Sequence, residues 1–238
     1  MIVQIEKPPV FEEIVCPEQI RILATHKAYC GMQGYALYEQ NDGQKSVIIS
    51  CLDKTAVLYG ETSDAAELKA FLQLMSTDVF CNARLAHQLD ITVHKQVNIM
   101  KRCGTNENAV LEEYPPFTTK QLHDALKQGE DGDIKAGEYE PFAADFSLRW
   151  RRKAAYGVLL EDKACVLSFN VLDNDAFING VAVRKKLRGT GLGKQAVMLF
   201  CEKLGQRNVY VGCTDRVIGF YKSMGFEKVG VAVYGAPQ

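Results

Sequence analysis

Glycines and cations gather in one short stretch of the sequence. Eleven residues without an acidic side chain contain five cations, namely Arg184, Lys185, Lys186, Arg188 and Lys194. Gly189, Gly191 and Gly193 lie among them. Glycines let backbone N–H groups converge on a ligand, and the start of a following helix adds the positive end of its dipole. The stretch therefore predicts a site for a phosphate or pyrophosphate.

Two of the three phosphate-loop patterns with similar spacing do not fit this stretch. A Walker loop aligned on Gly193-Lys194 would have Arg188 in place of its first glycine. A Rossmann fingerprint that started at Gly189 would have Lys194 in place of its third glycine. The pattern R-x-x-G-x-G remains, and Arg188, Gly191 and Gly193 match it without exception.

The elements around the loop must bring it to a sheet edge. The β-branched run at 177–183 predicts a strand that leads into the loop, and apolar residues at helical spacing predict a helix over 194–204. A strand at 208–212 and a helix near 216–223 follow. Earlier, a helix is expected over 118–127 and strands over 156–160 and 164–171. This order predicts an α/β arrangement with a mixed sheet and a crossover between neighbouring strands.

A second motif follows the loop in the expected order. Phe220-Tyr221 is succeeded by three residues and then by Gly225-Phe226. Together with R-x-x-G-x-G, this segment resembles the GNAT acetyltransferase superfamily over about residues 105–238. The resemblance implies the acyl-CoA N-acyltransferase (GNAT) fold.

The resemblance also implies a reaction, in which an acetyl group moves from acetyl-CoA to an amine-bearing acceptor. Tyr221 matches the family's general acid, which protonates the departing CoA thiolate. Thr214 stands where many relatives carry an asparagine that contacts the cofactor. The other cofactor-binding residues implied are Val181, Ala182 and Val183 on the strand, and Arg188, Gly189, Thr190, Gly191, Leu192, Gly193 and Lys194 in the loop.

No general base is identified for the amine. The strand at 177–183 carries no acidic residue or histidine, and Glu161, Asp173 and Asp175 lie on nearby turns. A water chain is an equal alternative. Cys213 lies beside the expected acyl site, but no histidine is near it in sequence, so we expect a small buried thiol and not an acetyl-cysteine.

The first half of the chain has the same order of elements. Strands are expected at 35–38, 46–52 and 55–59, a helix from near Asp64, and strands at 78–81 and 96–101. The junction at 60–65 has one glycine and two carboxylates, which would repel a pyrophosphate. We therefore expect two GNAT-like halves in tandem: a degenerate domain over 1–104 without a CoA loop, and the acetyltransferase domain over 105–238.

Composition excludes several other classes of protein. The 238 residues include 28 Lys and Arg against 29 Asp and Glu, and 47% are hydrophobic, which is unlike a disordered or nucleic-acid-binding chain. None of the eight cysteines forms a C-x-x-C pair, so no metal site is expected. No apolar run approaches the ~20 residues of a membrane helix. Free thiols without an export signal predict a cytoplasmic protein.

Two other functions stay open at this point. The missing base and Thr214 fit a non-catalytic acyl-CoA-binding regulatory module. A protein-interaction scaffold in which both halves have lost activity is a third alternative. Neither the acceptor amine nor the oligomeric state can be predicted from the sequence.

Overall fold

The computed structural model describes residues 1–104, 115–130 and 136–238, which divide into two units. The first unit comprises Met1–Ile99, Gly212–Arg216 and Lys228–Gln238, and the second comprises Met100–Val211 and Val217–Glu227. Residues 105–114, in which the predicted second domain begins, lie outside the described residues. No helix in the described part of the chain is long and apolar enough to span a membrane.

The first unit is built on an antiparallel meander that continues into a parallel strand. Strands β2 (Tyr35–Asn41), β3 (Ser46–Leu52) and β4 (Thr55–Gly60) pair in sequence order. β1 (Ile2–Ile5) pairs with the outer edge of β2, and β5 (Asp78–Asn82) lies parallel to β4. The predicted strands of the first half are confirmed, because their β-branched runs are bounded by residues that favour turns.

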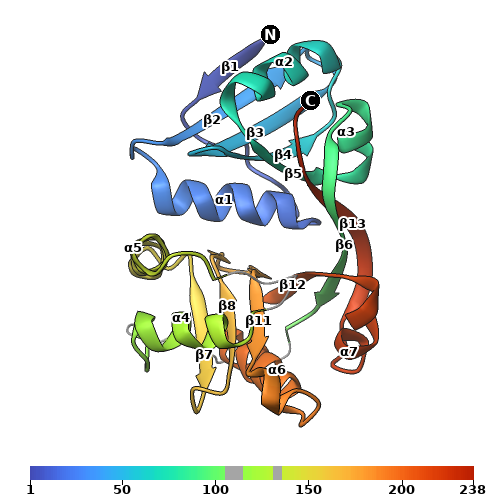
Figure 1. Ribbon diagram of the computed structural model, residues 1–238. Helices are drawn as coiled ribbons and strands as arrows, with labels where there is room; N and C mark the ends of the chain where they lie inside the picture. The colour runs from blue at the N-terminus through green and yellow to red at the C-terminus, as the bar shows by residue number, and fades with distance from the viewer. Residues whose placement is uncertain (105–114, 131–135) are drawn as a thin grey trace. The chain divides into compact units, whose positions relative to one another are not determined.

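Helices cover both faces of this meander. α1 (Pro17–Tyr29) lies on one face and α2 (Ala65–Met75) on the other (Figure 1). Alternate residues of β3 pack with Leu68 and Leu72 of α2 in one core cluster. α3 (Ala83–Gln88) follows β5. The sequence analysis missed α1, although the buried residues Ile20, Ala24 and Ala28 recur at the four-residue spacing of a helix face.

The last strand of the chain belongs to the first unit. β13 (Glu227–Ala236) pairs antiparallel with β5, in the register Ala232 to Asn82, and lies between β5 and β6 (Thr92–Arg102). Its ladder with β5 is the reason that Lys228–Gln238 join the first unit and not the second. The division of the chain therefore differs here from the predicted boundary after residue 104.

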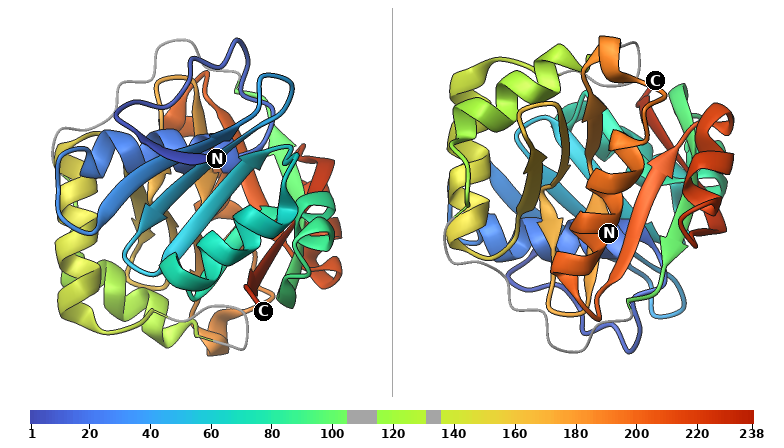
Figure 2. Two further views of the ribbon diagram at one scale, coloured as in Figure 1. Left: turned by 90° about the horizontal axis from the view of Figure 1, so that it is seen from above. Right: turned by 90° about the horizontal axis from the view of Figure 1, so that it is seen from below.

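The second unit contains a three-stranded antiparallel sheet between helices. β7 (Tyr156–Leu160), β8 (Ala164–Ser168) and β11 (Gly180–Val183) form the sheet in the order β11-β8-β7. Figure 2 shows α4 (Thr119–Gln128) and α5 (Tyr139–Arg151) on one side of these strands and α6 (Leu192–Leu204) on the other. The sequence analysis missed α5, whose buried aromatic residues recur every four positions: Phe142, Phe146 and Trp150.

The remaining strands of the second unit pair separately from that sheet. β10 (Asp175–Ile178) lies antiparallel to β9 (Asn170–Val171) and parallel to β12 (Asn208–Cys213). α7 (Ile218–Lys222) follows β12. Two single strands that we predicted, at 164–171 and 177–183, are each divided in two: β8 and β9, and β10 and β11.

Asn179 is the residue at which the predicted strand 177–183 divides. Its side-chain Oδ1 accepts hydrogen bonds from the backbone N–H of Phe169 at 2.7 Å and from Nδ2 of Asn170 at 2.9 Å. Its own backbone N–H donates to the carbonyl of Leu167 at 2.9 Å. These hydrogen bonds fix the backbone at Asn179, where the chain stops pairing with β12 and begins to pair with β8.

Gly60 provides a first prediction, because no side chain fits at this position. Its φ is +122°, and a Cβ there would lie 2.0 Å from the carbonyl oxygen of Ser46. Gly60→Ala combines overpacking with backbone strain, so we expect it to destabilise the protein by about 3 kcal/mol or more. Urea unfolding followed by circular dichroism measures this effect.

Gly43 offers a matched control in the neighbouring turn. Its φ is +88°, and nothing lies within 4 Å of an added Cβ. Gly43→Ala therefore incurs only backbone strain, about 1 kcal/mol. Equal losses for the two variants would contradict the close approach at Gly60.

Glu18 provides a prediction about pH. Its carboxyl is only 2% exposed, and burial raises its pKa above the ordinary value of 4.5. The folded protein therefore keeps a proton that the unfolded chain releases, so stability from protonated Glu18 is present below about pH 4.5 and is lost as pH rises through the folded pKa. Glu18→Gln is expected to raise Tm by roughly 2–4 °C at pH 8 and to leave it unchanged at pH 4.

The exposed Glu12 serves as the control for this measurement. Glu12→Gln should leave Tm unchanged at both pH values. A Glu18→Gln shift of the same size at pH 4 and pH 8 would mean that the effect does not come from ionisation of this carboxyl.

Candidate functional site

The site is organised around the divergence of β11 from β12. β10 and β12 pair in parallel as far as Ile178 and Val211. Beyond Asn179, the chain pairs with β8 instead, with Val181 opposite Val166. β11 thereby becomes an edge strand of its sheet. Ligands of α/β folds bind in crevices outside the carboxyl ends of parallel strands, where neighbouring connections separate.

The backbone of β11 presents polar groups along its open edge. The N–H of Arg184 donates to the carbonyl of Lys163 at 2.9 Å and continues the ladder between β11 and β8. Backbone groups of an antiparallel strand point alternately to its two sides. Those of Ala182 therefore point toward β8, and those of Val181 and Val183 point toward the open edge. Two of the three predicted strand residues thus offer backbone donors and acceptors to a ligand.

The glycine loop leads into an uncapped helix. Gly189 and Gly191 adopt left-handed φ values of +81° and +88°, and Gly191 is the N-cap of α6 without a side-chain cap. The first backbone hydrogen bond of α6 runs from the N–H of Gln195 to the carbonyl of Gly191, so the N–H groups from Gly191 to Lys194 have no acceptor within the helix. Thr190 directs its hydroxyl to the carbonyl of Leu187 at 2.7 Å. Four successive N–H groups at the start of a helix of 13 residues are thus available to an anion.

Cations surround these N–H groups. Lys185 and Lys186 are exposed in the 3-10 turn that precedes the loop. Nε of Arg184 is buried and has no hydrogen-bond partner in the described part of the chain. Nζ of Lys194 lies 3.3 Å from the carbonyl of Ser223. The loop therefore combines open backbone donors with a local positive field.

α7 is placed against the same loop. A Cβ at Gly193 would lie 3.2 Å from Cγ2 of Val183 and 3.6 Å from Cζ of Phe220, so the start of α6 packs between β11 and α7. Tyr221, the next residue, is 6% exposed, and its ring contacts those of Phe220 and Phe226 edge-on. The second unit thus brings the strand, the loop and the tyrosine motif together.

Thr214, Asp175 and Glu161 belong to segments of the chain other than the loop. Thr214 belongs to the segment Gly212–Arg216 of the first unit. Asp175 is buried and accepts a hydrogen bond from Nδ2 of Asn208 at 3.0 Å, at the amino end of β10. Glu161 pairs with Lys163 at 2.5 Å in the turn between β7 and β8. These contacts give the two carboxylates structural partners.

The corresponding junction of the first unit has the opposite chemistry. Asp64 caps α2 by accepting from the N–H of Glu67 at 2.9 Å. Thr62 donates to Oε1 of Gln40 at 2.5 Å, and Nε2 of Gln40 donates to the carbonyl of Asp64 at 2.9 Å and to Glu67 at 2.8 Å. Side chains of the unit itself therefore occupy the helix start that an anion would need.

A pocket of about 360 Å³ lies in the first unit where β4 and β5 end. Glu61 and Arg84 line it and form an ion pair at 2.7 Å. The guanidinium there already has a carboxylate partner, which weakens its field for a phosphate.

Sequence reasoning missed two residues that shape the site. Asn179 directs the strand divergence, and Gly129 at the end of α4 approaches β11 so closely that a Cβ would lie 2.7 Å from Cβ of Ala182. An asparagine within a β-branched run signals a possible bulge. Nothing in the local sequence marks Gly129, because its neighbour is more than 50 residues away in the chain.

Comparisons with known proteins agree with this geometry. The model of the acetyltransferase (GNAT) family matches residues 120–226. No curated protein sequence shows significant similarity to the chain. In the described residues, no group of three histidine, cysteine or acidic side chains could hold a metal ion.

Solved structures share the fold at low sequence identity. A GCN5-related N-acetyltransferase from Sphaerobacter thermophilus has a TM-score of 0.55 at 13% identity, and the match covers 90% of this chain and 83% of that one. One from Kribbella flavida has a TM-score of 0.51 at 16% identity, with coverages of 84% and 89%. A tandem GNAT protein from the clavulanic acid biosynthesis pathway has a TM-score of 0.55 at 10% identity, with coverages of 93% and 88%.

The tandem structure covers both halves of this chain. The first unit repeats the order of the second, with a meander, a helix, a parallel strand and a short helix, and is consistent with a second GNAT-like copy. The fold is thus a mixed α/β GNAT fold in two copies. The second unit has the loop and the tyrosine motif, and both lie within residues 120–226, which match the model of the acetyltransferase (GNAT) family.

Proposed function

We propose that this protein is an N-acetyltransferase that moves an acetyl group from acetyl-CoA to a primary amine. The observation that carries the proposal is the uncapped start of α6, where open backbone N–H groups meet a basic segment beside the free edge of β11. The open amides of a helix start suit the phosphates of a CoA pyrophosphate. No metal is needed to hold it.

The edge of β11 would receive the pantetheine arm. Its amides would pair with the outward backbone groups of Val181 and Val183 as an added strand does. One of these N–H groups would then lie near the thioester oxygen. There it would stabilise the negative charge that develops during attack, which is often a large catalytic contribution.

The reaction would proceed by direct attack. The neutral amine adds to the thioester carbonyl, the carbon–sulfur bond breaks, and the amide product and CoA thiolate form. Tyr221 would give its hydroxyl proton to the thiolate, since a phenol of pKa ~10 can protonate a thiolate whose thiol has a pKa of ~8.5 across a short hydrogen bond. The proton lost by the amine leaves through water or a base that we do not assign.

Cys213 supports direct attack over a covalent relay. Burial, with a smaller effect of Asp215, raises the pKa of this thiol to about 11. A thiol of that pKa is protonated at neutral pH and is a poor nucleophile. The other seven cysteines are also free, which fits our proposal of a reducing cytoplasmic location.

We propose that the first unit binds no CoA. The start of α2 is capped by Asp64, and Glu61 lies at the same junction. Bringing a pyrophosphate there would displace internal hydrogen bonds and oppose like charges. One working site in the second unit is the consequence.

Gly191 tests the phosphate site. Gly191→Trp places a bulky side chain where φ is +88° and next to the open N–H groups. We expect acetyl-CoA to bind at least ~100-fold more weakly, a loss of about 3 kcal/mol, as measured by isothermal titration calorimetry.

Gly43→Trp is the matched control, since Gly43 has the same φ of +88° and equal open space but lies in a turn of the first unit. It should bind acetyl-CoA like the wild type. Full binding by Gly191→Trp would show that the loop does not hold the cofactor.

Tyr221 tests the chemistry. Tyr221→Phe removes one hydroxyl, so we expect kcat to fall by about 10²–10⁴-fold while the Kd for acetyl-CoA changes less than about threefold. CoA release over a panel of amines measures kcat. Tyr156→Phe removes the hydroxyl of another buried tyrosine in the same unit and should retain full turnover.

Turnover by the wild-type protein distinguishes an acetyltransferase from a non-catalytic acyl-CoA-binding module. Turnover with at least one amine supports the enzyme. Tight acetyl-CoA binding without turnover on any amine would favour the non-catalytic binding module instead.

A further inference from the structure

Arg188 begins the R-x-x-G-x-G pattern, yet its guanidinium is engaged by protein atoms. One Nη donates to the carbonyl of Gly129 at 2.7 Å, and Nε lies 3.5 Å from the carbonyl of Val183. The two acceptors belong to different elements, the end of α4 and the end of β11. The planar fork of arginine suits such a two-point contact, whereas a lysine offers one point charge.

Gly129 is the close contact between those elements. It is the C-cap of α4, and an added Cβ would lie 2.7 Å from Cβ of Ala182 and 3.1 Å from the backbone nitrogen of Val183. The end of α4 therefore presses directly on the stretch of β11 whose outer edge we assign to the pantetheine arm. A shift of α4 would move that edge.

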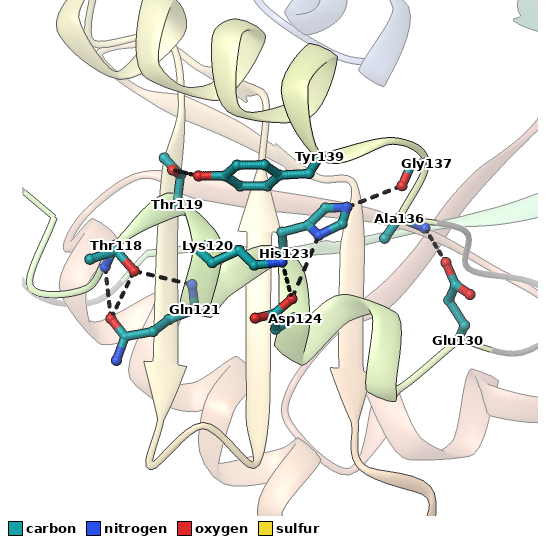
Figure 3. A network of polar contacts seen from close by, with 10 residues as sticks. All are labelled: Thr118, Thr119, Lys120, Gln121, His123, Asp124, Glu130, Ala136, Gly137 and Tyr139. Atoms are coloured by element: carbon teal, nitrogen blue, oxygen red, sulfur yellow. Dashed lines mark hydrogen bonds and ion pairs between the residues drawn. The ribbon is translucent and has the colours of Figure 1, made fainter.

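The opposite end of α4 is already fixed to α5. Figure 3 shows Thr119 facing the hydroxyl of Tyr139, at 3.1 Å, and Nε2 of His123 facing the carbonyl of Gly137, at 3.1 Å. Thr118 and Gln121 cap the first turn. At the carboxyl end of α4, the carbonyl of Gly129 accepts a hydrogen bond from the Arg188 guanidinium. A cation there also complements the helix dipole.

We propose that Arg188 is a positioning residue and not a phosphate ligand: its guanidinium holds the end of α4 against β11 and so sets the edge that receives the pantetheine arm. This inference rests on the proposed function for its effect on turnover. Lys186 is exposed in the neighbouring 3-10 turn, and we assign its ammonium group to the phosphates alone.

Two acetyl donors distinguish a positioning role of Arg188 from a phosphate-binding role. Acetyl-CoA carries the phosphates, and S-acetyl-pantetheine lacks them. If Arg188 positions β11, Arg188→Ala lowers kcat/KM by about 10- to 100-fold for both donors, and Arg188→Lys does not restore it. Lys186→Ala should lower kcat/KM for acetyl-CoA alone. Loss confined to acetyl-CoA in Arg188→Ala, with recovery in Arg188→Lys, would overturn the inference.

Amide hydrogen exchange in the ligand-free full chain tests the contact without turnover. The N–H groups of Gly129 and Glu130 donate within the last turn of α4 and are the probes. Arg188→Ala should speed their exchange at least about tenfold, and Lys186→Ala should not. Unchanged exchange in Arg188→Ala would overturn the inference.

A second variant approaches the contact from the other side. Gly129→Ala leaves the guanidinium intact but separates α4 from β11, so it should reproduce the loss for both donors if the fold survives, as circular dichroism verifies. If the wild type uses neither donor while the exchange result holds, the proposed function fails and the contact stands. If the wild type uses both donors and Arg188→Ala loses only acetyl-CoA, the inference alone fails.

Discussion

One constraint on the backbone shapes the whole second unit: a single stretch of chain must pair first with β12 and then with β8. Asn179 lies at this change, and its side-chain oxygen accepts hydrogen bonds from the backbone N–H of Phe169 and from Nδ2 of Asn170. The consequence is an edge strand with outward polar groups, next to the end of a parallel pair. The glycine loop and the start of α6 lie between that edge and α7, since Gly193 packs between Val183 and Phe220.

The two units differ at the start of one helix, and this difference decides whether the strand–helix connection can bind an anion. Both have a strand that leads into a helix and a parallel strand beyond it. In the second unit the helix begins at a left-handed glycine, and its first N–H groups have no acceptor within the helix. In the first unit the side chain of Asp64 accepts a hydrogen bond from an N–H group of the helix start, and Gln40 connects the junction to β2. A capped helix start is more stable on its own, whereas an uncapped one is open to a ligand.

Local patterns predicted most of the fold and the position of the loop, because glycine spacing, β-branched runs and apolar periodicity are local properties. α1 and α5 were missed, although Phe142, Phe146 and Trp150 mark a helix face. The close approach of Gly129 could not be predicted, since its partner Ala182 is far away in the chain. The division at Asn179 depends on the separate pairing of β10 with β12 and of β11 with β8. The pairing of the final strand with β5 likewise joins residues far apart in the chain.

Arg188 shows why a motif residue need not act as the motif's ligand. Its charge lies in the basic segment, so a reading by type and spacing makes it a partner for phosphate. Its fork, however, has neutral carbonyl acceptors on two elements. Backbone N–H groups can hold a pyrophosphate without it, because those at the uncapped start of α6 are open to an anion. A site built from main-chain groups demands few particular side chains, mainly glycines for the loop and residues that hold the strands in place. That requirement is compatible with the 10–16% identity at which solved structures share this fold.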